Sequence, residues 1–130
     1  MSNSTIKNLK DVEDAAQGFG LSPNLEARFA REPLGCEQMG VSYERLAPDF
    51  RTPFGHKHAT QEEVYVIVAG SGRVKIDDDV HDVKQWDAVR VGPGAMRNFE
   101  AGPDGLELIA MGAPKTPPGD AEMVQGWWID

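Results

Sequence analysis

Short segments in which apolar and polar residues alternate dominate the chain from residue 25 onward. Such alternation is typical of a β-strand that buries one face, and Gly, Pro or Asp residues separate the segments. The alternating segments lie at 25–31, 40–46, 73–77, 80–83, 87–91, 96–99 and 106–111, and an apolar run occupies 64–69. Short strands at this spacing predict an all-β fold, either a sandwich or a barrel, of which the jelly roll is one form.

The first 24 residues have a different, more polar character. Leu9 to Ala16 is weakly amphipathic and predicts a short helix before Gly18 and Gly20. The chain therefore divides into three parts. These are an N-terminal arm with a short helix (1–24), one β-barrel (25–112), and a C-terminal tail (113–130) that packs on the barrel or on a partner subunit.

Two apolar features need a covering surface. If Glu63 faces the interior, the stripe formed by Val64, Val66 and Val68 lies on the outer face of its strand. The N-terminal arm or a second subunit could cover this stripe. The adjacent Trp127–Trp128 near the chain end pose the same question. Because this is more apolar surface than a monomer of this size exposes, we expect a homodimer.

Composition narrows the class of protein. With 130 residues the chain is long enough for one domain with its own core. A net charge of −8 disfavours binding to nucleic acid or to an anionic membrane surface. Cys36 is the single cysteine, and neither a signal-peptide pattern nor an apolar run of about 20 residues is present. These features predict a cytoplasmic protein that binds neither nucleic acid nor membrane.

The candidate chemistry is concentrated between residues 54 and 70. His56 and His58 are one residue apart, so on a strand both side chains project from the same face. A short turn at 59–61 would return Glu62 or Glu63 beside them. Two imidazoles and one carboxylate form a set that holds a metal ion and leaves coordination positions open. The alternative is a pair of surface histidines beside an acidic turn.

The same stretch resembles the first sequence motif of the cupin family. That motif is His-x-His, four residues, Glu, six residues, Gly, and His56, His58, Glu63 and Gly70 match it. The spacing favours Glu63 over Glu62 as the carboxylate of the site. The glycine that begins the motif is absent, because Phe50 stands at its place.

The second cupin motif is largely lost. It runs Gly, five residues, Pro-x-Gly, two residues, His, three residues, Asn. The corresponding residues here are Trp86, Gly92, Gly94, Arg97 and Ala101, of which only Gly94 is identical. The resemblance covers about residues 38–112. It implies a small jelly-roll (cupin) barrel, usually dimeric, with a ligand cavity between its sheets.

Arg97 stands where metal-binding cupins have the histidine that is their fourth metal ligand. An arginine stays protonated and cannot serve as an ordinary ligand. A fixed positive charge about 5 Å from a divalent cation costs about 7 kcal/mol at an effective dielectric constant near 20. The implied cofactor is a divalent transition metal (Fe, Mn, Ni or Zn), but Arg97 argues against it.

Two arrangements of Arg97 remain open. In the first, Arg97 forms an ion pair with Glu63 inside the barrel and removes one metal ligand. In the second, His56, His58 and Glu63 hold a metal as a three-residue set, and Arg97 binds an anionic substrate.

We predict from these features a single-domain cupin that binds a small polar or anionic molecule inside the barrel. As an enzyme it would be of isomerase or oxygenase type, with His56, His58, Glu63 and Tyr65 as candidate catalytic residues. Arg97 would be the substrate-binding residue. The alternative is a non-catalytic binding or sensing module without bound metal, because the fold does not decide between these functions.

Overall fold

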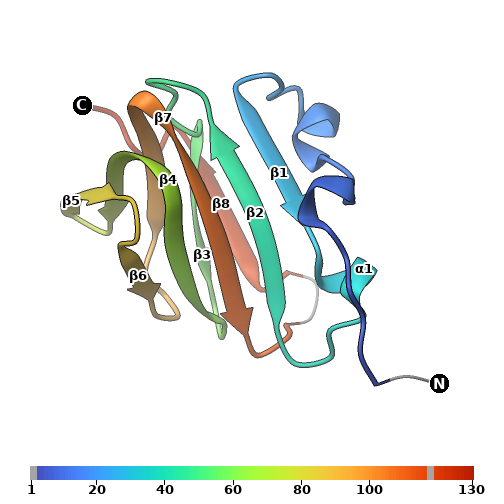
Figure 1. The fold of residues 1–130 in the computed structure, drawn as a ribbon. Helices are drawn as coiled ribbons and strands as arrows, with labels where there is room; N and C mark the ends of the chain where they lie inside the picture. The colour runs from blue at the N-terminus through green and yellow to red at the C-terminus, as the bar shows by residue number, and fades with distance from the viewer. Residues whose placement is uncertain (1–2, 117–118) are drawn as a thin grey trace.

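The computed structural model describes residues 3–116 and 119–130, which fold into a curled, two-layered β-barrel with only short helical pieces (Figure 1). The all-β fold class predicted from the alternation is confirmed. The strands of the described chain are β1 (Leu25–Phe29), β2 (Gly40–Leu46), β3 (Phe54–His58), β4 (Glu62–Ile76), β5 (Asp79–Lys84), β6 (Ala88–Val91), β7 (Arg97–Ala113) and β8 (Ala121–Gln125).

The long strands β4 and β7 belong to both layers. The first half of β4 pairs with the second half of β7, in a layer ordered β1–β2–β7–β4–β6. The second half of β4 pairs with the first half of β7, in a layer ordered β8–β3–β7–β4–β5. Each of these strands was expected as two separate segments. Strands β4 and β7 instead continue through the expected breaks, because they stay paired with each other as they bend from one layer into the other.

Glycines make this bend possible. The register between β4 and β7 shifts on both sides of Gly70, which has a φ of +76°. A Cβ atom on Gly70 would lie 2.1 Å from the carbonyl oxygen of Gly105, and one on Gly72 would lie 2.1 Å from that of Glu100. Gly70 is the glycine that the first cupin motif ends on, and its position leaves no room for a side chain.

The interior between the layers holds the large apolar side chains of both. Their inward positions alternate along each strand with outward ones, as the sequence pattern requires. The buried apolar core includes Leu25, Leu46, Tyr65, Ile67, Val74, Val83, Val91, Phe99, Leu106 and Leu108.

The N-terminal arm contains short helical pieces, as predicted, but not as one helix. One helix was expected over Leu9 to Ala16, but the arm contains two 3₁₀ turns, η1 (Leu9–Asp11) and η2 (Ala15–Phe19). Asp14 separates them, because its carboxylate accepts hydrogen bonds from the backbone N–H groups of Ala16 (3.0 Å) and of Ala27 on β1 (2.9 Å). The second bond ties the arm to the sheet, and a continuous helix could not make it. A short helix, α1 (Arg31–Leu34), also follows β1, where the strand was expected to continue to Arg31.

The C-terminal tail lies on the barrel of its own chain. Strand β8 pairs with β3, so that Phe54 lies opposite Gln125 and His58 opposite Ala121. Beyond it, Trp128 is 5% exposed, and the guanidinium of Arg51 lies 4.1 Å from the centre of a Trp128 ring.

This burial of Trp128 removes one of the two grounds for expecting a homodimer. The stripe of Val64, Val66 and Val68 is only partly buried, because the N-terminal arm packs on β1 and on the outer face of β2 instead. The homodimer therefore stays a prediction. Within residues 3–116 and 119–130, no helix is long and apolar enough to span a bilayer.

Candidate functional site

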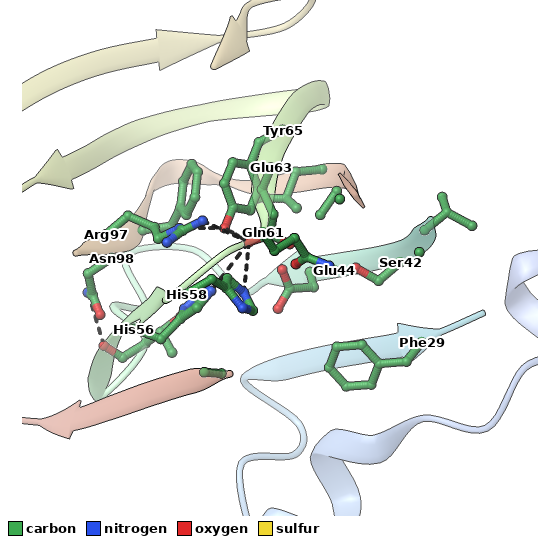
Figure 2. Close-up of a pocket in the computed structure, with 18 of the residues that line it drawn as sticks. Phe29, Ser42, Glu44, His56, His58, Gln61, Glu63, Tyr65, Arg97 and Asn98 are labelled. Atoms are coloured by element: carbon green, nitrogen blue, oxygen red, sulfur yellow. Dashed lines mark hydrogen bonds and ion pairs between the residues drawn. The ribbon is translucent and has the colours of Figure 1, made fainter. Parts of the chain in front are cut away.

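A cavity of about 480 Å³ lies between the two layers and is lined by His56, His58, Glu63, Tyr65 and Arg97, which the sequence motifs single out (Figure 2). His56 and His58 come from β3, Glu63 and Tyr65 from β4, and Arg97 from the start of β7. The cavity has the size of a small-molecule site.

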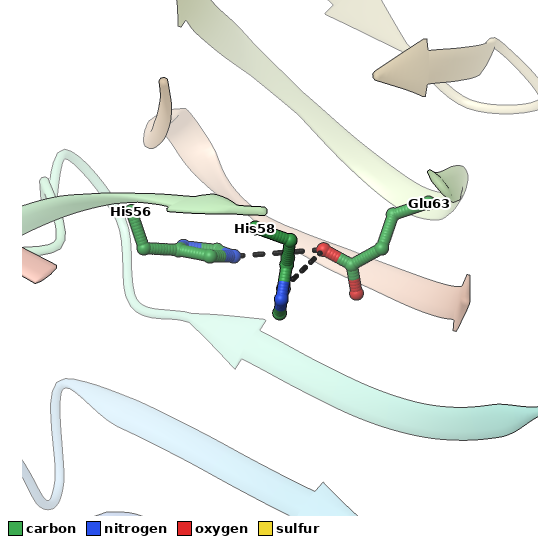
Figure 3. Close-up of side chains that lie close together, drawn as sticks. All are labelled: His56, His58 and Glu63. Carbon is green, nitrogen blue, oxygen red and sulfur yellow. Dashed lines mark ion pairs between the residues drawn. The ribbon is translucent and has the colours of Figure 1, made fainter. Parts of the chain in front are cut away.

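The two histidines converge on one oxygen of Glu63. Nε2 of His56 lies 3.5 Å and Nε2 of His58 lies 3.4 Å from Oε1 of Glu63 (Figure 3). The imidazole rings meet edge to face, with their centres 5.3 Å apart. The neighbouring Glu62 points outward and pairs with Arg90 at 2.5 Å. The structure thus turns Glu63, and not Glu62, toward the histidines.

Arg97 is completely buried and forms the ion pair that was one of the two expected arrangements. Its Nη2 donates to Oε1 of Glu63 (3.1 Å), and its Nε donates to the hydroxyl of Tyr65 (3.0 Å). Its Nη1 donates to the backbone oxygen of Ala95 (2.9 Å). Each guanidinium nitrogen therefore already has a partner within the chain.

These contacts hold Glu63 ionised and Tyr65 protonated. Burial acts to raise the pKa of Glu63, but hydrogen bonds with His56, His58 and Tyr65 outweigh it and hold that pKa well below its usual value. Burial and the adjacent Glu63 charge raise the pKa of Tyr65 well above its usual value. Tyr65 accordingly donates its hydroxyl proton to Oε1 of Glu63 at 2.7 Å.

Glu44 is a cavity residue that the sequence reasoning missed. Its side chain extends from β2 into the cavity, and it lies opposite the fully buried Leu108 in the sheet register. Among the described residues it has no hydrogen-bond or ion-pair partner. Burial, together with repulsion from the Glu63 charge, raises the pKa of Glu44 to about 7. Two carboxyl groups therefore face one cavity, and the pKa of Glu63 is lowered while that of Glu44 is raised.

The signal for Glu44 was present but ambiguous. Alternation along 40–46 places Glu44 and Leu46 on one face of β2 and Tyr43 and Arg45 on the other. Apolar content does not decide which face is inward. Tyr43 is buried on the outer face, where Lys10 of the N-terminal arm lies 5.0 Å from its ring centre. A second missed residue, Asp120, contacts His58 from the C-terminal tail.

His56, His58 and Glu63 could hold a metal ion. One ligand atom from each lies within 4.8 Å of the others. Ligands about 2.1 Å from a metal at tetrahedral angles lie about 3.4 Å apart, which agrees with the spacing of the nitrogens from Oε1. The charge of Arg97 opposes this fit, because its guanidinium is bound to the same carboxylate oxygen.

Solved structures of known proteins share this architecture. A cupin protein of Bacteroides fragilis matches with a TM-score of 0.72 and 21% identity, over 88% of this chain and 86% of that one. Streptomyces Pac13, solved with uridine, matches with a TM-score of 0.74 and 12% identity, over 95% of this chain and 92% of that one. Oxalate decarboxylase of Bacillus subtilis matches with a TM-score of 0.73 and 20% identity, over 95% of this chain and 33% of that one.

The chain therefore has the cupin fold, as the His-x-His motif indicated. At these identities the likeness shows the fold and not the activity. Among curated proteins, an uncharacterized protein of Methanocaldococcus jannaschii is 30% identical over 71 residues, which is 54% of this chain and 57% of that protein. No protein-family model matches the chain.

Proposed function

We propose that the chain is a small-molecule enzyme that moves a proton on a polar substrate in the cavity, as isomerases do, with Glu44 as the group that exchanges the proton. The observation that carries this proposal is that two carboxyl groups face one cavity in different surroundings: Glu63 contacts His56, His58 and Arg97, whereas Glu44 has no hydrogen-bond or ion-pair partner among the described residues. Two titratable groups whose surroundings push their pKa values apart mark the acid and base assignments of many active sites.

Glu44 suits proton transfer for two reasons. A group whose pKa of about 7 lies near neutral pH is present in both its acid and its base form. It also has no hydrogen-bond or ion-pair partner in the described chain, so this partly buried carboxyl faces the cavity with its hydrogen-bonding capacity unused. A substrate hydroxyl or C–H group next to Glu44 would give that carboxyl the contact that the protein does not.

Glu63 and Arg97 take a different role in this proposal. Their ion pair already neutralises both charges, so Arg97 does not offer a free positive charge to a substrate. This favours a neutral polar substrate over an anionic one. Arg97 and Tyr65 then fix the Glu63 carboxylate, and Glu63 in turn orients His56 and His58 as hydrogen-bonding groups of the cavity.

Metal-dependent oxygenase chemistry is the less favoured alternative. A metal held by His56, His58 and Glu63 would polarise an oxygen of the substrate as a Lewis acid. We propose that affinity for a metal is weak, because metal binding must compete with the buried Arg97 for Glu63.

The similar structures support a small polar substrate. Pac13 is described as a nucleoside dehydratase, and oxalate decarboxylase acts on a small acid, both with this fold. The cavity of about 480 Å³ in this chain is of a size that suits a small molecule.

Solvent exchange tests the proposal. We expect that a panel of hydroxy-carbonyl sugars, with uridine added, contains a compound whose C–H proton exchanges with D₂O when the protein is present, as NMR would detect. Replacing Glu44 with Gln should abolish exchange and leave binding within a few-fold, while Glu62→Gln, which changes an exposed carboxylate, should exchange normally. Exchange that survives in Glu44→Gln would contradict the role of Glu44. Binding without exchange in the wild type would favour the non-catalytic module.

A further inference from the structure

The C-terminal tail reaches the site through one carboxylate. Oδ2 of Asp120 lies 3.1 Å from Nδ1 of His58, the ring nitrogen that faces away from Glu63. Strand β8 begins at the next residue and pairs with β3, so the sheet itself holds Asp120 beside His58. The Asp120 side chain is only 5% exposed.

The other oxygens of Asp120 already accept hydrogen bonds. Oδ1 accepts hydrogen bonds from the backbone N–H of Thr60 (3.0 Å) and from its hydroxyl (2.9 Å). The backbone oxygen of Asp120 accepts from the N–H of Ala59 (3.0 Å). These bonds attach the tail to the turn between β3 and β4 and leave Oδ2 directed at the imidazole.

The surroundings of Asp120 determine the direction of the bond to His58. Both donors of Thr60 point at the carboxylate, and Oδ2 lies within hydrogen-bond distance of Nδ1 of His58. An ionised carboxylate can only accept hydrogen bonds. His58 lies between two carboxylates, and the contact of its Nδ1 with Asp120 (3.1 Å) is shorter than that of its Nε2 with Glu63 (3.4 Å). Oε1 of Glu63 already accepts hydrogen bonds from Tyr65 and Arg97. In a neutral ring the proton therefore belongs on Nδ1, and Nε2 carries the lone pair.

We propose that Asp120 is a positioning residue that keeps a proton on Nδ1 of His58. Nε2 of His58, which faces Glu63 and the cavity, is then the ring nitrogen that carries the lone pair. His56 has no such partner among the described residues, where its polar contact is the one between Nε2 and Glu63. The two histidines are thus unequal: His58 contacts a carboxylate through each of its ring nitrogens, whereas His56 does so through Nε2 alone among the described residues. The C-terminal tail completes the site in this way.

NMR of the ¹⁵N-labelled protein tests this inference. The chain has three histidines, so long-range ¹H–¹⁵N spectra of the rings can be assigned with His56→Gln and His81→Gln variants. We expect Nδ1 of His58 to be protonated in the wild type above neutral pH. In Asp120→Asn the two donors of Thr60 keep the amide oxygen, and the amide NH₂ then faces Nδ1, which must accept. The proton should therefore leave Nδ1 and appear on Nε2.

A matched control separates this effect from a change of charge on the tail. Glu122 lies on β8 in an exposed pair with Lys57 (3.2 Å), so Glu122→Gln removes the same charge without touching His58. We expect wild-type His58 signals in this variant. An unprotonated Nδ1 in the wild type, or an unchanged His58 spectrum in folded Asp120→Asn, would overturn the proposal. If Asp120→Asn does not fold, the wild-type spectrum alone still decides.

The inference uses the site of the proposed function but does not need substrate or turnover. If no compound exchanges its proton but His58 has the expected tautomer, the proposed function fails and the role of Asp120 stands. If exchange occurs but His58 does not carry its proton on Nδ1, the role of Asp120 fails and the proposed function stands.

Discussion

Replacing Glu44 with Gln should stabilise the protein at alkaline pH. Glu44 lines the cavity without a partner, and burial followed by repulsion from Glu63 raises its pKa from 4.5 to about 7. Glutamine has nearly the same shape and is never charged. The substitution therefore removes the unfavourable charge and keeps the packing.

The size and the pH range of the effect follow from the two pKa values. In the unfolded chain Glu44 loses its proton near pH 4.5, but in the folded chain it does so only near pH 7. The stability that the protonated group gives is complete below about pH 4.5 and is lost as the pH rises through about 7. The difference of the two values, 7 − 4.5, corresponds to about 3 kcal/mol, and because Glu44 is only partly buried we expect an effect of about 1–3 kcal/mol.

Urea unfolding of wild type and Glu44→Gln measures this difference. The two free energies of unfolding should agree within about 0.5 kcal/mol near pH 4, and the variant should be more stable by about 1–3 kcal/mol near pH 8. Glu62→Gln is the control, because Glu62 is exposed and its pair with Arg90 lies on the surface. If Glu44→Gln and wild type show the same stability at both pH values, Glu44 is not a perturbed cavity carboxyl, and the reasoning fails.

Three further predictions concern the ion pair, the bend and the assembly. Arg97→Met should destabilise the fold by about 3–5 kcal/mol in urea unfolding, because Glu63 keeps a buried charge without its partner. Arg97→His should raise the affinity for Zn²⁺ or Co²⁺ at least tenfold in calorimetry, because it removes that positive charge and adds a metal ligand. A loss below about 1 kcal/mol in the first, or unchanged affinity in the second, would refute the role given to Arg97. Gly70→Ala should destabilise by more than about 2 kcal/mol, because its Cβ would meet the Gly105 carbonyl, while Gly18→Ala, with open space around it, should not. Light scattering should give twice the chain mass of 14.2 kDa if the partly buried valine stripe is a dimer interface, and a mass of one chain would refute this.

The predictable part of this protein is the part that follows local patterns. Alternation along the chain gave the strands, and motif spacing selected Glu63 over Glu62, as the histidine contacts show. Strand parity also placed Arg97 on the same face as His56, its neighbour across β3 and β7.

The missed residues depend on contacts between distant segments. Glu44 lies on a strand with apolar side chains on both faces, and the packing of the N-terminal arm over Tyr43 determines which face is inward. Asp120 meets His58 across 62 residues of sequence, through a strand pairing that no local pattern encodes. The short N-terminal helical segment is present, but it is divided into two 3₁₀ turns for a similar reason, because Asp14 bonds to Ala27 on β1.

Metal content is the most direct test of the central claim, which is that Arg97 and Glu63 form an internal ion pair and leave proton transfer to Glu44. The protein should be purified without added metal or chelator and analysed for Fe, Mn, Ni and Zn by elemental analysis. Because the buried guanidinium competes for the Glu63 oxygen at 3.1 Å, we expect well under one metal ion per chain. One metal ion per chain would contradict the account, and would show that His56, His58 and Glu63 form a metal centre despite Arg97.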